Sequence, residues 1–285
     1  MASIAHVIHP KAVEFHRLHS HRELVFWRFN TKNFSDFGTN DLLFFLSTTR
    51  RNEKGLLGFG QLKESKNLKT TTLFKRFGKR IGENSEEEFI DMINRLKKTQ
   101  EFPDRLNCLF LENVTYFKSP IYLSDFGYDL SKQVESFIYF DVESNITSQI
   151  LRKAANVGLD LWSETQDPFN HQLKGLANCY EAARLIDESE LFKNRVNHRF
   201  KIEIGEPLMM NPMVKYLLNE NKLTLLIPIY TQMKKEHYSV LGLIKLLEKQ
   251  MDKDTSIQVV FNSVPNFNSP LLAYLSDLTT LDSAL

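Results

Sequence analysis

The chain has 285 residues, 42% of them hydrophobic and 25% charged, which is a globular composition long enough for two domains. It contains no run of about 18 apolar residues, and its amino terminus lacks the basic start and apolar stretch of a secretory signal. These features argue against a membrane protein and predict a cytoplasmic one.

The formal net charge of +1 conceals an uneven distribution. Residues 1–100 carry 18 Lys and Arg against 11 Asp and Glu, whereas residues 101–285 carry 18 against 24. The basic half is where a polyanion would bind. A chance division of surface charge is the alternative explanation.

Neither the histidines nor the cysteines predict a metal site. Five of the eight histidines lie in residues 1–22, but no carboxylate or cysteine accompanies them at a ligand spacing. We therefore expect residues 1–22 to form a surface arm or helix. Cys108 and Cys179 lie outside any Cys-x-x-Cys motif, and both are expected to be buried as small hydrophobic side chains. No metal or cofactor is predicted.

Three strands are expected over residues 24–29, 42–47 and 56–63. In the first, side chains at 25, 27 and 29 share one face, and those at 24, 26 and 28 share the other. In the third, Gly58 and Gly60 fall on one face. Glycine weakens a strand, so this pair indicates a barrel bend, an approaching ligand or another strand packed closely.

Basic residues dominate positions 63–80. If residues 71–80 form a helix, Lys75 and Lys79 become i, i+4 neighbours, as do Arg76 and Arg80. Like charges in this arrangement repel, and a phosphate backbone would relieve the repulsion; a solvated face is the competing interpretation. Ser85 and Glu88 then form a capping box that begins a helix ending near residue 98. Strands are expected at 106–117, broken by Ser119-Pro120, and at 137–140.

Beyond residue 141 the apolar pattern changes to helical spacing, followed by alternating strands and helices. We expect helices over 146–161 and 173–183, then a strand at 199–204, a helix at 212–218, a strand at 223–230, a helix at 238–250 and a strand at 257–261. A last helix begins at Ser269-Pro270. The predicted organisation is an arm or helix at 1–22, a β-rich domain at 23–142 and an α/β domain at 143–285.

Four short motifs in residues 23–140 resemble a known family. They are Phe26-Trp27-Arg28-Phe29, the run from Asn40-Asp41 to Ser47, Gly55-Leu-Leu-Gly58-Phe-Gly60, and Tyr116-Phe117-Lys-Ser-Pro120-Ile-Tyr-Leu123. In this order they resemble the PUA-like superfamily, most closely its EVE and ASCH domains, with the YTH methyl-adenine readers as more distant relatives. The resemblance implies an α+β protein in which a curved PUA-like β-barrel precedes the second domain.

The resemblance also implies a pocket in which an aromatic ring stacks on a flipped or unpaired base. Trp27 is the stacking candidate, although it could equally be a core residue, and the other expected pocket residues are Phe29, Phe45, Ser47 and Thr48. The family's methyl-base cages often contain two or three tryptophans, whereas this half has one. Phosphates would contact Lys75, Arg76, Lys79 and Arg80.

The leading hypothesis is a non-enzymatic protein that binds DNA or RNA, including a modified base, through residues 23–140. Residues 143–285 would bind a protein partner or self-associate. One alternative is an enzyme acting on nucleic acid or nucleotides through the carboxyl half, where His171, His198 and His237 have no neighbouring nucleophile and Lys201, Glu203 and Glu206 lack a nuclease spacing. Another is a protein-interaction scaffold.

Overall fold

The computed structural model describes residues 3–30, 34, 37–49, 53–97, 101–128, 136–140, 145–159, 173–192, 200–208, 211–219, 222–231, 233–262 and 269–275. The chain divides into two compact units, Met1–Asn170 and His171–Leu285, and each contains one sheet. The protein is therefore α+β with two sheets. The predicted domain limits at 22–23 and 142–143 concern independent folding and stay a prediction.

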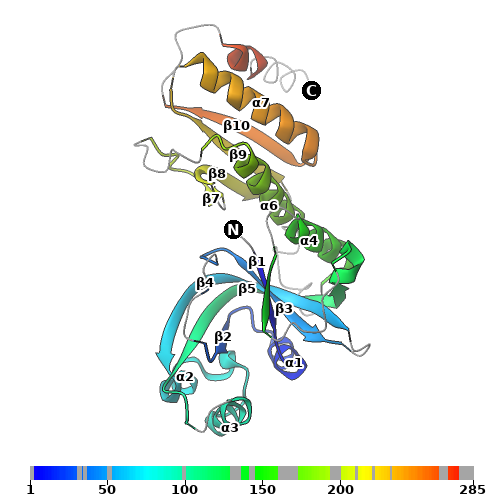
Figure 1. The fold of residues 1–285 in the computed structure, drawn as a ribbon, viewed down its shortest axis with the longest axis vertical. Helices are drawn as coiled ribbons and strands as arrows, with labels where there is room; N and C mark the ends of the chain where they lie inside the picture. The colour runs from blue at the N-terminus through cyan, green and yellow to red at the C-terminus, as the bar shows by residue number, and fades with distance from the viewer. Residues whose placement is uncertain are drawn as a thin grey trace. The chain divides into compact units, whose positions relative to one another are not determined.

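The first unit holds a six-stranded sheet with helices on both sides (Figure 1). Its elements are β1 (Ser3–Val7), α1 (Pro10–Leu18), β2 (Leu24–Arg28), β3 (Leu42–Thr48), β4 (Lys54–Lys69), α2 (Thr70–Phe77), the 3-10 helix η1 (Gly78–Ile81), α3 (Glu86–Leu96), β5 (Arg105–Tyr122), the 3-10 helix η2 (Leu123–Phe126), β6 (Phe137–Phe140) and α4 (Ile146–Val157). The strand order is β2-β5-β4-β3-β1-β6. Every neighbouring pair is antiparallel except β1 and β3.

The sheet is open, whereas the resemblance implies a curved β-barrel. Within the described residues, β2 and β6 are its two edges, and no pairing joins them. Residues 1–22, expected as an arm or helix, place β1 inside the sheet between β3 and β6. A strand of five residues is too short to show a clear alternation in the sequence. In the folded unit, β1 faces β2.

Apolar residues cover both faces of the sheet. One core cluster contains Leu24, Leu43 and Phe45, with Phe26 packed beside it. The other contains Val25, Ile81 and Phe89 and lies between the sheet and helices α2 and α3, with Trp27 packed beside it. The alternation predicted for the first strand is therefore confirmed, because odd and even positions of β2 enter different clusters.

The break expected at Ser119-Pro120 is wrong, since β5 continues to Tyr122. Only residues 107–111 of β5 pair with β2. Pro120 therefore lies where one side of β5 has no described strand partner, and its missing N–H leaves no ladder bond broken there.

Local signals fix the helices beside β2. The Ser85 hydroxyl accepts the backbone N–H of Glu88 at 3.2 Å, as the capping box predicts. Helix α2, in contrast, ends at Phe77 instead of reaching residue 80, because Gly78 adopts a positive φ of 54°. Lys79 and Arg80 consequently lie on η1 rather than on one stripe with Lys75 and Arg76.

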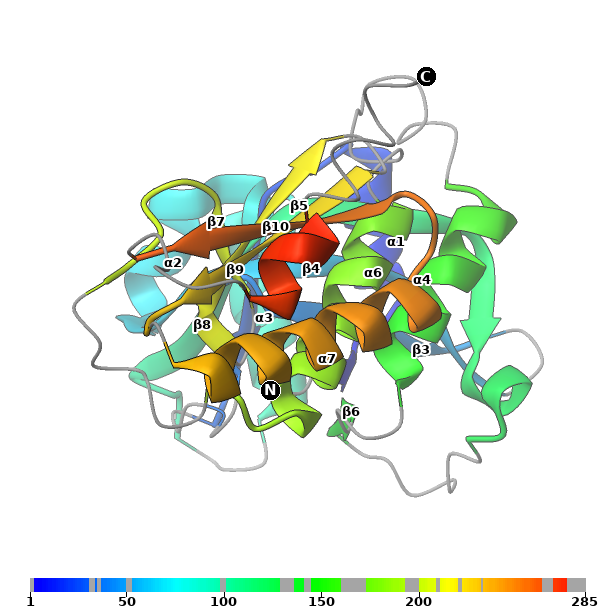
Figure 2. The same cartoon turned by 90° about the horizontal axis from the view of Figure 1, so that it is seen from above.

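The second unit is a small α/β layer structure (Figure 2). It contains α6 (Leu173–Glu188), β7 (Glu206–Leu208), β8 (Asn211–Asn219), β9 (Lys222–Ile229), α7 (Lys234–Gln250), β10 (Thr255–Phe261) and a helical turn at 270–275. The sheet order is β10-β9-β8-β7; β9 and β10 are parallel and joined by α7, and α6 and α7 pack against the sheet. None of the described helices has the length and hydropathy needed to span a bilayer.

Two sequence predictions fail in this unit. The helix expected at 212–218 is wrong because these residues belong to β8. The strand expected at 199–204 is also wrong where it is described, since residues 200–204 have no regular strand. Pro212 suggested a helix start, but it precedes the first β8 residue that pairs with β9, Lys215, so a strand accommodates it there.

Candidate functional site

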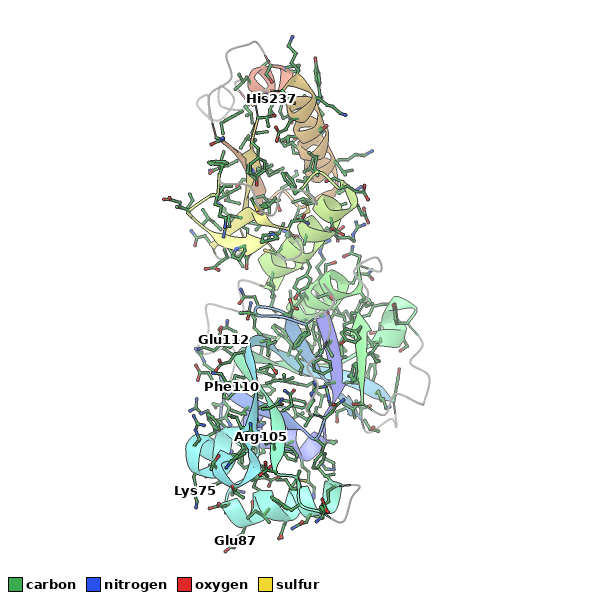
Figure 3. All side chains as sticks on the ribbon, turned by 60° about the vertical axis from the view of Figure 1, so that its left-hand side comes forward. Lys75, Glu87, Arg105, Phe110, Glu112 and His237 are labelled. Carbon is green, nitrogen blue, oxygen red and sulfur yellow. The ribbon has the colours of Figure 1, made fainter. Side chains whose placement is uncertain are left out.

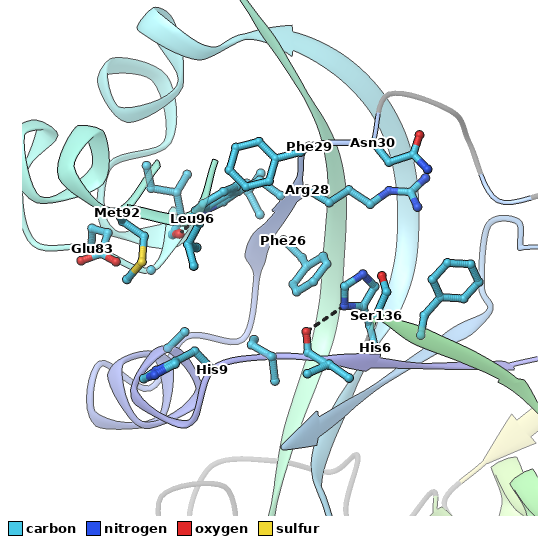
Figure 4. A pocket seen from close by; sticks show the side chains of 18 of the residues that line it. His6, His9, Phe26, Arg28, Phe29, Asn30, Glu83, Met92, Leu96 and Ser136 are labelled. Atoms are coloured by element: carbon cyan, nitrogen blue, oxygen red, sulfur yellow. Dashed lines mark hydrogen bonds between the residues drawn. The ribbon is translucent and has the colours of Figure 1, made fainter. Parts of the chain in front are cut away.

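A cavity of about 740 Å³ lies along the free edge of β2 (Figure 4). Its walls come from β1, α1, β2, η1, α3 and the start of β6, with residues that adjoin these elements. All four residues from 25 to 28 line it. Because consecutive strand residues alternate between faces, the cavity must follow the edge of β2 that β5 leaves open. This volume is typical of small-molecule sites.

Aromatic rings from β1, β2 and β6 line one end of the cavity. The ring of His6 on β1 meets Phe26 on β2 edge-on, with centroids 4.6 Å apart. On its other side His6 is stacked with Phe137, at 6.2 Å and an interplanar angle of 23°. Residues that are far apart in the sequence of the first unit therefore meet between β1 and β2.

His6 is neutral at physiological pH. Burial lowers its pKa to about 4, and the positive charge of Arg28 contributes in the same direction. Its Nδ1 lies 2.9 Å from the carbonyl oxygen of Val7, which can only accept, so Nδ1 carries the proton. The Nε2 atom is therefore a hydrogen-bond acceptor.

A buried guanidinium lies beside these rings. Arg28 is 8% exposed, and its Nε donates to Asn107 Oδ1 at 2.8 Å. Asn107 is held in turn by Ser65 and Asn67, to which its Nδ2 donates at 3.1 Å each. The guanidinium carbon also lies 3.8 Å from the centroid of the Phe34 ring, a cation–π contact that helps to fix its position.

Trp27 and Phe29 line the other end of the cavity, beside η1 and α3. Trp27 is partly buried, donates from Nε1 to the carbonyl of Ile81 at 3.1 Å, and meets the buried Phe89 ring edge-on at 5.5 Å. Phe29 is 37% exposed and meets Trp27 edge-on at 5.8 Å. Of the five expected pocket residues, these two line the cavity.

The other three expected pocket residues lie elsewhere. Phe45 is buried in the core, with its ring near that of Tyr116. Ser47 is fully buried and Thr48 is exposed at the end of β3. None of the three lines this cavity, so the structure does not place them beside Trp27.

The four expected phosphate contacts separate into two pairs. Lys75 and Arg76 are exposed on α2, where Lys75 points away from the sheet (Figure 3). On η1, Lys79 Nζ lies 3.5 Å from His19 Nε2, and Arg80 forms an ion pair with Glu23 at 2.9 Å. η1 ends at Ile81, which lines the cavity, so Lys79 and Arg80 are the expected contacts adjacent to it along the chain.

Three histidines cluster near η1, and one of them, His16, also lines the cavity. The Nδ1 atoms of His16 and His21 are 2.9 Å apart, and the rings of His19 and His21 stack at 5.4 Å. Burial lowers the pKa of His16 to about 3 and also lowers that of His21. Among the residues that the structure describes, no group of three or more His, Cys, Asp or Glu is arranged to hold a metal.

His6 and Phe137 were not identified from the sequence, because only the sheet topology brings them to β2. Arg28 did carry a signal: the alternation of β2 places an arginine on the same face as Leu24 and Phe26. A charged residue at an inward position needs a fixed partner, and this could have identified Arg28 as a site residue.

The second unit contains a buried serine–histidine pair. His237 Nδ1 lies 2.8 Å from Ser269 Oγ, and Nε2 lies 3.3 Å from the carbonyl of Thr231. Both side chains are buried, so the pair joins the 270–275 turn to α7. Glu203 and Glu206 are exposed, while His171 and His198 lie outside the described residues.

Cys108 and Cys179 are buried free thiols, as predicted. Burial raises the pKa of Cys108 to about 12 and raises that of Cys179 further. Neither thiol is a candidate nucleophile, because the reactive form is the thiolate.

No family model and no curated protein matches the chain. Among solved structures, ASCH from Zymomonas mobilis has a TM-score of 0.36 and 16% identity, over 55% of this chain and 96% of its own. Two single-residue variants of that protein give TM-scores of 0.38 and 0.39 at 16% identity, over 54% and 53% of this chain and 98% and 95% of theirs. Each of these alignments covers about half of this chain.

Proposed function

We propose that the first unit binds nucleic acid and holds one unpaired base in the cavity along β2. The observation that carries the proposal is the convergence of aromatic rings from β1, β2 and the start of β6 on one cavity of about 740 Å³. Flat rings around an apolar space suit a flat heteroaromatic ligand. The basic residues on α2 and η1 suit a phosphate backbone.

The energetics favour a single strand. Stacking of a base on an aromatic side chain contributes about 1–3 kcal/mol. Extruding a base from a duplex costs a few kcal/mol. The two terms nearly cancel for a paired base, so a single-stranded or mismatched site should bind more tightly than a duplex.

Fluorescence anisotropy with single- and double-stranded DNA and RNA, unmodified and base-modified, tests this proposal. We expect binding that weakens with added salt and that falls about tenfold when one ring is removed. Phe29→Ala is the informative variant, because this ring is exposed and lines the cavity; Trp27→Ala should lose binding too, with some stability. Ile90→Ala is the control, since Ile90 is similarly exposed on α3 but does not line the cavity.

Absence of salt-sensitive binding to every strand would reject the proposal. An equal loss of binding affinity in Phe29→Ala and Ile90→Ala would show that the nucleic acid binds outside the cavity.

A further inference from the structure

Resting on this proposed function, we propose that His19, His21 and Lys79 form a phosphate-binding site beside the cavity, and that this site takes up a proton when it binds a phosphodiester of the strand. Lys79 comes from η1, His19 ends α1, and His21 follows two residues later. The nucleic acid would therefore bind more tightly as the pH falls.

The end of η1 lies between the cavity and the histidines. Ile81, Gly82 and His16 line the cavity. Gly82 has a φ of 100°, and a Cβ atom there would lie 3.3 Å from His16 Nε2, so α1 and η1 approach closely at this point. Lys79 precedes Gly82 by one turn and lies beside His19. A strand with one base in the cavity can thus place a neighbouring phosphate on these side chains.

His16 and His21 share one proton between facing nitrogen atoms. Their Nδ1 atoms are 2.9 Å apart, so one donates and the other accepts. Burial lowers the pKa of His16 to about 3, which leaves His16 neutral. A proton added to the pair consequently goes to His21, whose Nδ1 then donates to His16 while its Nε2 becomes a donor for a ligand.

His19 orients the lysine. The Nδ1 atom of His19 donates to the carbonyl of Phe15 at 2.9 Å, so in the neutral ring Nε2 accepts, and Lys79 Nζ lies 3.5 Å from it. The rings of His19 and His21 stack with centroids 5.4 Å apart. Lys79 and His19 are exposed and His21 is partly exposed, so a phosphate can reach all three from solvent.

Positive charge exceeds negative charge around His21. Among the described residues, the nearby charged and titratable groups come from α1 and its end, the turn before β2, η1 and β5: Glu14, His16, Arg17, His19, Arg22, Glu23, Lys79, Arg80 and Tyr116. Both carboxylates are paired with arginines, Glu14 with Arg17 at 3.8 Å and Glu23 with Arg80 at 2.9 Å. A phosphodiester would supply the negative charge that the cluster lacks.

This charge couples phosphate binding to protonation. Burial lowers the pKa of His21, and repulsion from His19, Arg80 and Lys79 lowers it further. A bound phosphodiester attracts the imidazolium and raises this pKa. A ligand that raises a pKa binds more tightly where the group is protonated, so the affinity rises as the pH falls through the pKa of His21 in the complex.

The test uses the full chain and a short oligothymidine strand, whose charge is constant between about pH 5 and 8, the range in which histidine titrates. At constant ionic strength we expect about tenfold tighter binding at about pH 5.5 than at about pH 8, because each pKa unit gained on binding is a tenfold gain in affinity. Calorimetry in buffers of different ionisation enthalpy should show the uptake of about one proton per bound strand.

Two variants separate the roles of the side chains. The double variant His19→Gln with His21→Gln should bind equally at both pH values. Lys79→Gln should weaken binding and reduce the slope of log K against log salt by about one. Lys249→Gln is the matched control, because it removes an exposed lysine from α7 in the second unit; it should keep the salt slope and the pH dependence.

Binding by the unmodified protein that does not change with pH and takes up no proton would overturn this site and leave the proposed function standing. A pH dependence that survives in the double variant, or an unchanged salt slope in Lys79→Gln, would also overturn it. Binding to no strand would overturn both proposals. Because the pH series and the calorimetry use the unmodified protein, a variant that folds poorly does not prevent the decision.

Discussion

Asp41, directly before β3, is a fully buried carboxylate. Its Oδ2 accepts the backbone N–H of Gly38 at 2.7 Å. Its Oδ1 has no hydrogen-bond partner within the described part of the chain. Burial raises the pKa of this carboxyl to about 7, although the Gly38 bond acts in the opposite direction. The folded state therefore favours the protonated acid, whereas the unfolded chain ionises near pH 4.

The consequence is a stability that falls as the pH rises. Between about pH 4 and 7 the folded state binds more protons at Asp41 than the unfolded state does, so the contribution of Asp41 to the free energy of unfolding decreases with pH. At one pKa unit per 1.36 kcal/mol, the loss is at most about 4 kcal/mol. We expect Asp41→Asn to remove this dependence and to be more stable than the unmodified protein at pH 8.

Urea unfolding at several pH values measures this difference. The difference between Asp41→Asn and the unmodified protein should grow steadily between about pH 4 and 7 and then level off. An unchanged difference across that range would show that Asp41 is ionised throughout.

At the scale of elements, Gly58 explains why β4 carries glycines. A Cβ atom at Gly58 would lie 2.2 Å from the backbone oxygen of Thr115 on β5, and one at Gly60 would lie 3.0 Å from Leu111 Cβ. Of the three explanations left open by the sequence, the close approach of another strand is the one observed. The glycines therefore serve the β4–β5 ribbon and not the cavity.

We expect Gly58→Ala to destabilise the first unit by about 1–3 kcal/mol, because backbone must move to admit the methyl group. The melting temperature should fall by several degrees. Gly38→Ala is the matched control: no atom lies within 4 Å of the place that its methyl group would take, and its Tm should change little. A Tm unchanged in Gly58→Ala would mean that the ribbon relaxes freely at this position.

The same scale shows which parts of the fold can be predicted from sequence. The faces of β2 and the start of α3 follow from the periodicity of 24–28 and from the Ser85 cap, which are local signals. The strand at 211–219 and the length of β5 depend on where each proline falls relative to neighbouring strands. That relation is a property of the sheet, so a local pattern cannot supply it.

At the scale of the whole molecule, the site residues also divide into those that a local pattern predicts and those that only the sheet topology brings together. Trp27 on β2 and Phe29 directly after this strand were identified from one local motif that resembles the PUA-like superfamily. His6 and Phe137 are 131 residues apart in sequence, and β1 pairs with β6 to bring them together. The resemblance to PUA-like proteins implied a pocket, but its position along the free edge of β2 depends on the open sheet.

Helix α4 bears on where the first unit ends. It lies beyond the predicted boundary at 142–143, yet it packs against β5 and buries Ile146, Ile150 and Leu151. Thr147 is hydrogen-bonded to Ser3 at 2.5 Å. After the helix, the backbone N–H of Lys118 donates to the carbonyl of Gly158 at 3.1 Å. These contacts tie residues 145–159 to the sheet of the first unit.

We therefore expect a fragment of residues 1–170 to fold cooperatively and to bind nucleic acid as the full chain does, whereas residues 1–142 fail to fold. Burying each large apolar side chain of α4 contributes about 1.5–3 kcal/mol. The three together approach the whole stability of an ordinary domain, about 5–15 kcal/mol. Circular dichroism melting of both fragments, with anisotropy binding of the longer one, makes the comparison. A cooperative melt of residues 1–142 would mean that α4 is dispensable and that the domain ends where the sequence predicts.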